Sequence, residues 1–355
     1  MTWLAKAVFV GVIGASAISA FSYWQFQGPI LREGQNVLVD IPVRGGVRNV
    51  ALDLSQQNVA YAWQTRIAGW WYVNHHHLTL KAGRYLLNGP MTWEQLFLKI
   101  SRGQGETMSI TFIEGKRWRD FRELLKKNEH ISDPEFLNQS EAHIANTLRR
   151  GKADWVCPPN ILEGCLMPDT YALYSGISVH EVLSRAYVRY DSIVRSIWRT
   201  RDADVPLRSP YEMVILASMV EKESAHDEDR GRIARVFMNR LRQGMRLQSD
   251  PTVIYGIQNF NGNLTREHLR ADHPFNTYTR SGLPYTPIAA SGRAALEAVA
   301  HPTSGRWYYF VAHADHSTTI FSETLAQHNR AVWQHQVAPA QADRRARREI
   351  SEGQR

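Results

Sequence analysis

The chain has 355 residues, which is enough for two modest domains or one large one. With 43% hydrophobic and 21% charged residues it has the composition of an ordinary globular protein, which excludes a fibrous or wholly disordered chain. The formal net charge of +8 is compatible with nucleic acid, an anionic membrane surface or an anionic polymer as a partner, and it does not choose among them.

The N-terminal residues indicate where the chain works. Lys6 is followed by an apolar run, residues 7–24, that holds no charged side chain, and a span of about 17–25 such residues is needed to cross a bilayer. Because the positive charge lies on the short N-terminal side, residues 1–27 are predicted to be a cytoplasmic stub and a single-pass anchor. A cleaved signal peptide is the alternative, since Ala15-Ser16-Ala17 resembles a cleavage site. In both interpretations the chain after residue 27 is exported from the cytoplasm, which disfavours nucleic acid as a partner.

Residues 28–105 have the pattern of a small module of strands and helices. The sharpest signal is a helix that begins after Thr92, because Thr92 and Gln95 form a capping box and Gly103 can end the helix. The predicted elements are strands at 37–43 and, in two pieces, at 78–87, helices at 47–57 and from Trp93, and an aromatic-rich stretch at 70–72. A glycan-binding module and a plain spacer fit this pattern equally well.

Residues 106–335 form the longer, second part of the chain. Ser209, Pro210 and Glu212 give one helix a cap, a proline at its first position and an acidic first turn. The other predicted elements are a strand at 108–113, helices at 118–127, after Ser178 and at 231–243, a hairpin at 307–321, a last short helix to Trp333, and a polar, hinge-like segment up to Lys152. The fold class is therefore α+β, followed by a basic tail at 336–355.

Two glutamates at the end of the helix after Ser209 are candidates for acid–base chemistry. Residues 213–220 are almost entirely apolar and run into Glu221-Lys222-Glu223. Residues two apart on a helix point about 200° apart, so the two glutamates cannot share a role. Glu223 stacks on the more apolar face, where desolvation raises the pKa of a carboxyl group and suits it to act as a general acid. The alternative is a pair of surface glutamates that bind nearby basic side chains.

Polar side chains are dense in residues 245–256 and 276–287, which are predicted to be loops. Asn, Gln, Thr, Tyr and Asp suit the hydroxyl and N-acetyl groups of sugars. Ordinary turn chemistry explains the same residues without a ligand, because Asp-Pro and Gly-Leu-Pro are turn formers.

Metal and serine-hydrolase chemistry have little support. The sequence has no His-Glu-x-x-His and no Gly-x-Ser-x-Gly, and His75, His76 and His77 are consecutive, so they do not share a helix face. No metal or cofactor is therefore expected. Cys157 and Cys165 lie in the exported region, where a disulfide and two separate thiols are both open.

A long, ordered set of motifs resembles the endolytic murein (peptidoglycan) transglycosylase family, the YceG-like lytic transglycosylases. The matching stretches are LASMVEKE at 216–223, VFMNRL at 236–241, GMRLQSDPTVIYG at 244–256, NTY at 276–278, GLP at 282–284, PI at 287–288, HN at 328–329 and, upstream, Glu163-Gly164 and PDTY at 168–171. The sequence departs from the family pattern at Met167, where an aromatic residue is usual, and at the two cysteines.

The resemblance implies that Glu223 is the catalytic residue, in agreement with the burial argument. It also implies a module resembling a LysM domain at 28–105, a catalytic domain at 106–335, and a single-pass inner-membrane protein whose catalytic domain lies in the periplasm. The implied substrate is newly made peptidoglycan, and peptidoglycan synthases are candidate partners. The residues expected to contact the glycan are Ser218, Asn239, Gln248, Asp250, Tyr255, Asn276, Thr277, Tyr278, Glu163 and Asp169.

The expected reaction needs a single carboxyl group. Glu223 protonates the oxygen between N-acetylmuramic acid and N-acetylglucosamine and then accepts the proton of the muramic C6 hydroxyl, which closes a 1,6-anhydro ring. A muramidase would need a second carboxylate, for which Asp250, Asp169 and Glu163 are candidates. An anchored glycan-binding scaffold without enzymatic activity is the remaining alternative.

Overall fold

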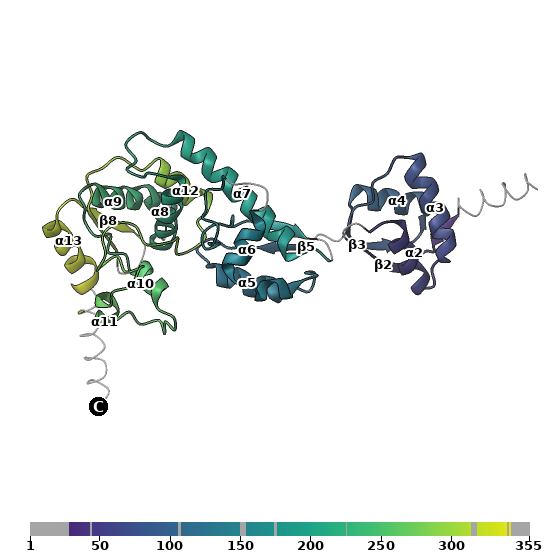
Figure 1. Ribbon diagram of the computed structural model, residues 1–355, viewed down its shortest axis with the longest axis horizontal. Coiled ribbons are helices and arrows are strands. Elements are labelled where there is room, and N and C mark those ends of the chain that lie inside the picture. The colour runs from purple at the N-terminus through teal and green to yellow at the C-terminus, as the bar shows by residue number, and fades with distance from the viewer. Residues whose placement is uncertain are drawn as a thin grey trace, which may run out of the picture. The chain divides into compact units, whose positions relative to one another are not determined.

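The structure is a computed structural model that describes residues 28–42, 45–105, 108–149, 154–173, 176–224, 226–313, 318–338 and 341. The predicted anchor at 1–27 and most of the basic tail lie outside these residues. Within the described ranges, no helix is both long and apolar enough to cross a membrane. The chain divides into two compact units (Figure 1). Unit 1 runs to Ile110 and includes Asn128–Pro134 and Tyr171–Val179, and unit 2 holds the rest.

Unit 1 is built on two short antiparallel strand pairs, β1 with β4 and β2 with β3. Its elements are β1 (Pro29–Leu31), β2 (Asn36–Ile41), α2 (Val47–Gln56), α3 (Ala62–His75), β3 (Gly83–Asn88), β4 (Met91–Thr92) and α4 (Trp93–Arg102). Apolar side chains from the strands and from all three helices form one core, in which Val39, Leu54, Leu87, Leu96 and Phe97 are fully buried.

Local signals position α4 as expected. The Gln95 amide donates to Thr92 Oγ1 at 3.3 Å, and the Thr92 amide donates to Gln95 Oε1 at 2.9 Å, which completes the capping box. Gly103 ends the helix in the left-handed region with φ +73°. A residue with a Cβ atom adopts this backbone conformation only with strain.

The predicted strand pair at 78–87 is only half correct. β3 forms, but residue 78 instead closes the end of α3, because the Leu78 amide donates to the Val73 carbonyl at 2.9 Å. The aromatic stretch at 70–72, to which no element was assigned, is helical and belongs to α3. Tertiary packing of Ala68 and Tyr72 in the core of unit 1 outweighs the weak local signal for a helix.

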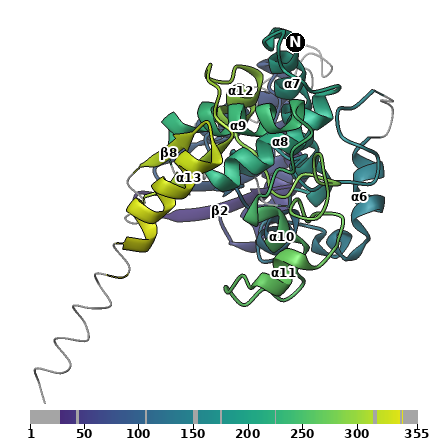
Figure 2. The same ribbon diagram turned by 90° about the vertical axis from the view of Figure 1, so that its left-hand side faces the viewer.

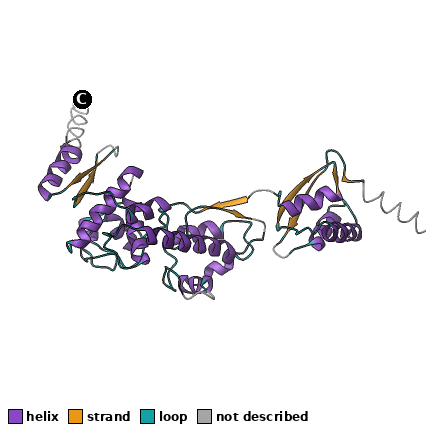
Figure 3. Ribbon diagram, turned by 90° about the horizontal axis from the view of Figure 1, so that it is seen from above, coloured by secondary structure: helices purple, strands orange, loops and turns teal. Residues whose placement is uncertain are grey.

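Unit 2 is mostly helical (Figure 3). Strand β5 (Met108–Thr111) pairs with β6 (Thr170–Leu173), and most residues of these two strands belong to unit 1. The hairpin of unit 2 consists of β7 (Tyr309–Ala312) and β8 (Thr319–Ser322). The helices are α5 (Trp118–Lys126), α6 (Glu141–Leu148), α7 (Val179–Thr200), α8 (Pro210–Glu223), α9 (Arg230–Arg242), α10 (Asp250–Gly256), α11 (Arg266–Arg270), α12 (Arg293–Ala300) and α13 (Leu325–Val332), with 3₁₀ turns at Pro134–Asn138 and Asp227–Asp229 and a π-helical turn at Trp333–Val337.

Helix α8 lies at the centre of unit 2. Ser209 Oγ accepts from the Glu212 amide at 3.2 Å and Pro210 takes the first position, as predicted. Every residue from Met213 to Val220 is buried, and α9 and α12 pack against the helix (Figure 2). Because residues 213–220 of α8 are almost entirely apolar on all sides, the fold encloses them, and the charged side chains lie in the first turn, at Glu212, and in the last turn.

Two features differ from the sequence expectations or decide between them. The polar segment before Lys152, predicted to be hinge-like, contains the turn Pro134–Asn138 and α6, which bury Leu137 and Ile144. Cys157 and Cys165 form a disulfide with Cα atoms 6.2 Å apart. The spacing alone could not decide between a disulfide and two free thiols.

Candidate active site

Glu223 is the last residue of α8, and the chain leaves the helix at Ser224, which is extended. Ser249 Oγ donates a 2.6 Å hydrogen bond to Glu223 Oε1. Burial raises the pKa of Glu223 to about 7; the Ser249 bond and the positive charge of Arg240 oppose this rise, and the charge of Asp250 adds to it. The carboxyl group can therefore be protonated or ionised near neutral pH, as a residue that must both give and take a proton requires.

Glu221 faces a different part of unit 2. Its Oε2 accepts from the Gly292 amide at 3.1 Å, and Arg230 lies 3.7 Å from its Oε1. Burial also raises the pKa of Glu221, and the Gly292 bond counters this effect. The two glutamates thus point to separate environments, as the helical geometry predicts, and Glu221 is engaged in holding the start of α12.

A pocket of about 360 Å³ opens beside Glu223. Its lining comes from α8, α9, the loop before α10, the first residue of α10, the 276–280 turn, β7 and α13, and consists of Glu223, Arg240, Gln248, Asp250, Tyr278, Tyr309, Phe310, Leu325 and His328. Four residues predicted from the sequence, Glu223, Gln248, Asp250 and Tyr278, are therefore brought together. The pocket combines polar groups with aromatic and aliphatic surface, as a sugar site requires.

Asp250 and Tyr278 are joined directly. The Tyr278 hydroxyl donates to Asp250 Oδ1 at 2.6 Å, and burial raises the pKa of this phenol. Gln248 has φ +50°, and its amide donates to the Thr277 carbonyl at 3.1 Å, so the loop before α10 is held against the 276–280 turn. These contacts place three polar side chains around one opening.

Two of the residues expected to contact the glycan instead support this loop from inside. Thr277 Oγ1 accepts from the Ser249 amide at 3.0 Å and lies 2.8 Å from Thr252 Oγ1. The Asn276 side-chain amide donates to three carbonyl groups, at His268, Leu269 and Ala271. Both side chains are buried and lie outside the pocket lining, so their role in the structure is to hold Ser249 and Tyr278 in place.

Ser218 and Asn239, which were also expected to contact the glycan, instead bond to backbone groups inside unit 2. Ser218 Oγ accepts from the Ile288 amide at 3.0 Å and donates to the Ile215 carbonyl. The Asn239 side chain donates to the carbonyls of Gly305 and Trp307, which fixes the chain as it enters β7. Neither lines the pocket, because both point into the interior of unit 2.

Arg240 is the cation of the site, and the sequence did not single it out. Its Nε donates to the Tyr308 carbonyl at 2.7 Å and its Nη1 to the Leu247 carbonyl at 2.6 Å, while the guanidinium lies 5.3 Å from the centre of the Tyr309 ring. These bonds hold the group rigidly at the wall of the pocket. Its charge favours the ionised form of Glu223.

A second carboxyl group with a raised pKa lies elsewhere in unit 2. Glu163 is 7% exposed, and its oxygens accept from the Trp118 amide at 3.1 Å and from the Tyr255 hydroxyl at 3.2 Å. Burial raises its pKa to about 7, and the Trp118 bond opposes the shift. Neither Glu163 nor Tyr255 is part of the pocket lining. Asp169 pairs with Arg189 at 2.5 Å and also lies apart from it.

The part of the chain from residue 39 to residue 334 matches the YceG-like family. The chain belongs to the YceG-like family. The described residues hold no cluster of three or more His, Cys, Asp or Glu side chains that could bind a metal ion.

Relatives of this YceG-like protein carry a common name. It is 28% identical over 318 residues to the "Endolytic murein transglycosylase" of Bacillus subtilis (strain 168), which covers 85% of this chain and 86% of that protein. It is 26% identical over 328 residues to the protein of that name from Streptococcus pneumoniae (strain R6), covering 84% of this chain but 58% of the pneumococcal protein. A crystal structure of a yceG-like protein from Listeria monocytogenes gives a TM-score of 0.51 at 28% identity, covering 83% of this chain and 98% of that one.

Several pocket residues of the YceG-like protein were not predicted individually. Arg240 and His328 lie in motifs that matched the family, yet nothing in the sequence assigned them to the site. Tyr309, Phe310 and Leu325 come from the hairpin and α13, about a hundred positions from Glu223 in the sequence, and only the tertiary fold brings them to the pocket.

Proposed function

We propose that this chain is an endolytic peptidoglycan lytic transglycosylase, a lyase whose acid–base residue is Glu223. The observation that carries the proposal is a single carboxyl group of pKa about 7 at the wall of a polar and aromatic pocket. The names of the relatives agree with it. The substrate is the β-1,4 bond between N-acetylmuramic acid and N-acetylglucosamine within nascent strands, and its cleavage ends strand elongation.

In the first half of the reaction the protonated Glu223 gives its proton to the glycosidic oxygen as the bond from that oxygen to muramic C1 breaks. The 4-hydroxyl of N-acetylglucosamine leaves. In the second half the ionised Glu223 accepts the proton of the muramic C6 hydroxyl, and the C6 oxygen forms a bond to C1. The 1,6-anhydro product forms without water, and Glu223 is protonated again.

The other pocket residues have the chemistry to hold the sugar. Gln248 and the bonded pair of Asp250 and Tyr278 offer donors and acceptors for hydroxyl and N-acetyl groups. Tyr309 and Phe310 offer apolar ring surface. Arg240 increases the share of ionised Glu223, which aids the base step and opposes the acid step.

A muramidase would need a second carboxylate that faces the same bond. Asp250 is the carboxylate that shares the pocket with Glu223, and it accepts a hydrogen bond from the Tyr278 hydroxyl. Glu163, the other carboxyl group with a pKa near 7, lies outside the pocket lining. Asp250 is therefore the carboxylate that a hydrolase would use beside Glu223 in this pocket, and the reaction products distinguish the two enzymes.

We further propose that the protein is held in the inner membrane by residues 1–27 with both units in the periplasm, where peptidoglycan synthases are candidate partners. This part of the proposal is supported by the uncharged apolar run at 7–24 and by the disulfide between Cys157 and Cys165, which suits an oxidising compartment.

The test is mass spectrometry of the products that the full chain releases from purified peptidoglycan, beside Glu223→Gln and the matched control Glu221→Gln. We expect internal fragments that end in 1,6-anhydro-muramic acid with the wild-type chain and with Glu221→Gln, and none with Glu223→Gln. Reducing ends would identify a hydrolase. Absence of cleavage by the wild-type chain would favour a binding scaffold.

A further inference from the structure

The outward face of α3 carries large apolar side chains. Trp63, Ile67 and Trp70 are 56, 49 and 66% exposed, and Trp71, beside them, is exposed as well. Positions separated by three and four residues share one side of a helix. The opposite side of α3 packs into the core of unit 1 through Ala68 and Tyr72. We call Trp63, Ile67, Trp70 and Trp71 the α3 tryptophan face.

This face is unusual for a helix in contact with water. α3 is apolar both on its core side and across this outward face, and contiguous exposed apolar surface marks an interaction site. Tryptophan is enriched where a bilayer meets water, because its ring is apolar and its N–H group can remain hydrated. The composition of the α3 tryptophan face therefore suits a lipid surface.

Positive charge lies beside the face. Arg48 and Arg66 line a pocket of about 590 Å³ together with Trp70 and Asn74. Guanidinium groups next to interfacial aromatic rings favour anionic lipid headgroups. Ile67, which lies between Trp63 and Trp70 on this face, offers no hydrogen bond to a sugar.

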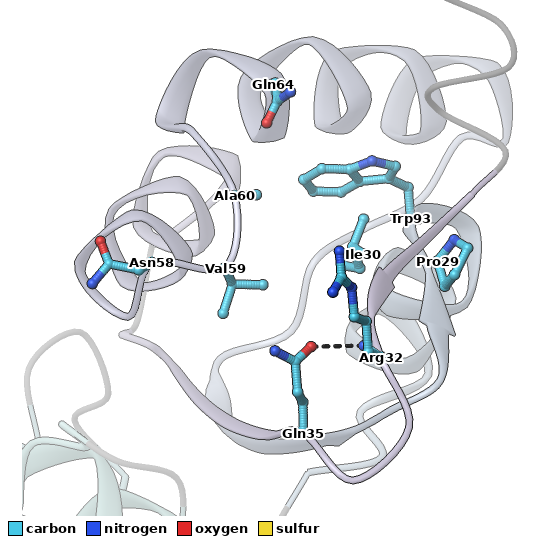
Figure 4. Close-up of a pocket in the computed structure, with 9 residues that line it drawn as sticks. All are labelled: Pro29, Ile30, Arg32, Gln35, Asn58, Val59, Ala60, Gln64 and Trp93. Atoms are coloured by element: carbon cyan, nitrogen blue, oxygen red, sulfur yellow. Dashed lines mark hydrogen bonds between the residues drawn. The ribbon is translucent and has the colours of Figure 1, made fainter.

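The path of the chain brings unit 1 close to the predicted anchor. Trp24, the end of the apolar run, and Gly28 are four positions apart, and four positions of extended chain span at most about 14 Å. Gly28 leads into β1, whose Pro29 lines a pocket together with Gln64 of the first turn of α3 (Figure 4). The tryptophan face thus begins near the point where the chain enters unit 1.

We propose that the α3 tryptophan face lies in the interface of the bilayer that holds the N-terminal anchor, with Arg48 and Arg66 toward anionic headgroups. Unit 1 is then a membrane-bound base for the catalytic unit and not a free spacer. The inference rests on the membrane anchor proposed above, and it does not depend on the reaction that unit 2 catalyses.

The experiment uses the full chain in lipid nanodiscs with and without phosphatidylglycerol. Because the two native cysteines form a disulfide, an environment-sensitive fluorophore can be attached to Asn74→Cys, next to the tryptophan face, or to Arg199→Cys, an exposed site on α7. Quenching by brominated lipid is measured for both. We expect severalfold stronger quenching at position 74, increased by phosphatidylglycerol.

Two substitutions make the result specific. Trp70→Ser together with Ile67→Ser should abolish the quenching at position 74, while Trp333→Ser, at an exposed tryptophan in unit 2, should leave it unchanged. Circular dichroism verifies that the variants are folded.

Equal quenching at both sites, or none at position 74, overturns the inference. So does a fluorophore that responds only to added glycan strands, which would make the face a glycan site. A chain that does not enter nanodiscs overturns the anchor and the docking together. Product analysis of the same samples reports on the reaction separately, so a failure of docking is distinguishable from a failure of the proposed activity.

Discussion

Ser249 Oγ donates a 2.6 Å hydrogen bond to Oε1 of Glu223, and this bond joins the last residue of α8 to the residue that precedes α10. Ser249 is itself fixed by Thr277, whose hydroxyl accepts from the Ser249 amide. The orientation and the pKa of the proposed catalytic carboxyl group therefore depend on a loop that comes 26 residues later in the chain.

Replacing Ser249 by alanine should shift the pH dependence of cleavage. The Ser249 bond lowers the pKa of Glu223 against the effect of burial. Without the bond the pKa of Glu223 rises, so its protonated form persists to higher pH. The alkaline limb of the pH–rate profile therefore shifts to higher pH. Ser224→Ala, which removes a hydroxyl that bonds to the His226 carbonyl, is the control and should leave the profile in place. An unshifted profile in Ser249→Ala would mean that another group controls the alkaline limb.

The bonded pair of Asp250 and Tyr278 should contribute to turnover. Tyr278→Phe removes the hydroxyl that donates to Asp250 at 2.6 Å and leaves the ring in the pocket. A hydrogen bond to a charged group contributes about 1.5–3 kcal/mol, so we expect kcat/KM for strand cleavage to fall about tenfold or more. Tyr285→Phe, on an exposed tyrosine, is the matched control. Equal rates for Tyr278→Phe and the wild-type chain would remove Tyr278 from the site.

Glu163 should make stability depend on pH. Its folded-state pKa of about 7 lies above the ordinary value of 4.5, so between these values the folded protein binds more protons than the unfolded chain. Stability conferred by the protonated group is complete below the unfolded pKa and is lost as the pH rises toward and through about 7. The unfolding free energy of the wild-type chain should therefore fall between about pH 5 and about pH 8. In Glu163→Gln this fall should be smaller by up to about 3 kcal/mol, because glutamine does not titrate.

Urea unfolding of the wild-type chain and of Glu163→Gln at the two pH values measures this difference. Glu181→Gln, on the surface of α7, is the control, and its pH dependence should match that of the wild-type chain. If the stability of Glu163→Gln depends on pH as that of the wild-type chain does, the proton taken up on folding belongs to a group other than Glu163.

The sequence was most informative where a local pattern and the tertiary fold agree. The Thr92 capping box, the Ser209–Pro210 helix start and the burial of Glu223 all depend on spacing within one helix, so periodicity and capping chemistry predicted them. Helix α3 was not predicted, because its outward face is apolar and the alternation of apolar and polar residues that marks a surface helix is absent. Its end is closed by the hydrogen bond from the Leu78 amide to the Val73 carbonyl, which depends on the folded chain.

The pocket was predicted only in part, because most of its walls depend on long-range packing. The polar composition of the predicted loops indicated Gln248, Asp250 and Tyr278, which the fold brings to the pocket lining, although Asp250 begins the helix α10 and does not lie in a loop. The same composition includes Asn276 and Thr277, which the fold buries. A sequence pattern cannot separate a side chain that faces a ligand from one that holds the loop. That distinction requires the hydrogen-bond partners.

The disulfide should stabilise the segment that carries Glu163. Cys157 and Cys165 enclose eight residue steps, with Glu163 between them, and cross-linking so short a loop restricts the unfolded chain by on the order of 2–3 kcal/mol. Replacing both cysteines by serine should lower the unfolding free energy by about that amount. The pocket beside Glu223 contains neither cysteine nor Glu163, so cleavage by the folded variant should stay close to the wild-type rate. Urea unfolding with and without a reducing agent measures the first effect, since reductant should destabilise the wild-type chain but not the variant. A variant that unfolds like the wild-type chain yet loses its activity would instead assign the segment around Glu163 a direct part in catalysis.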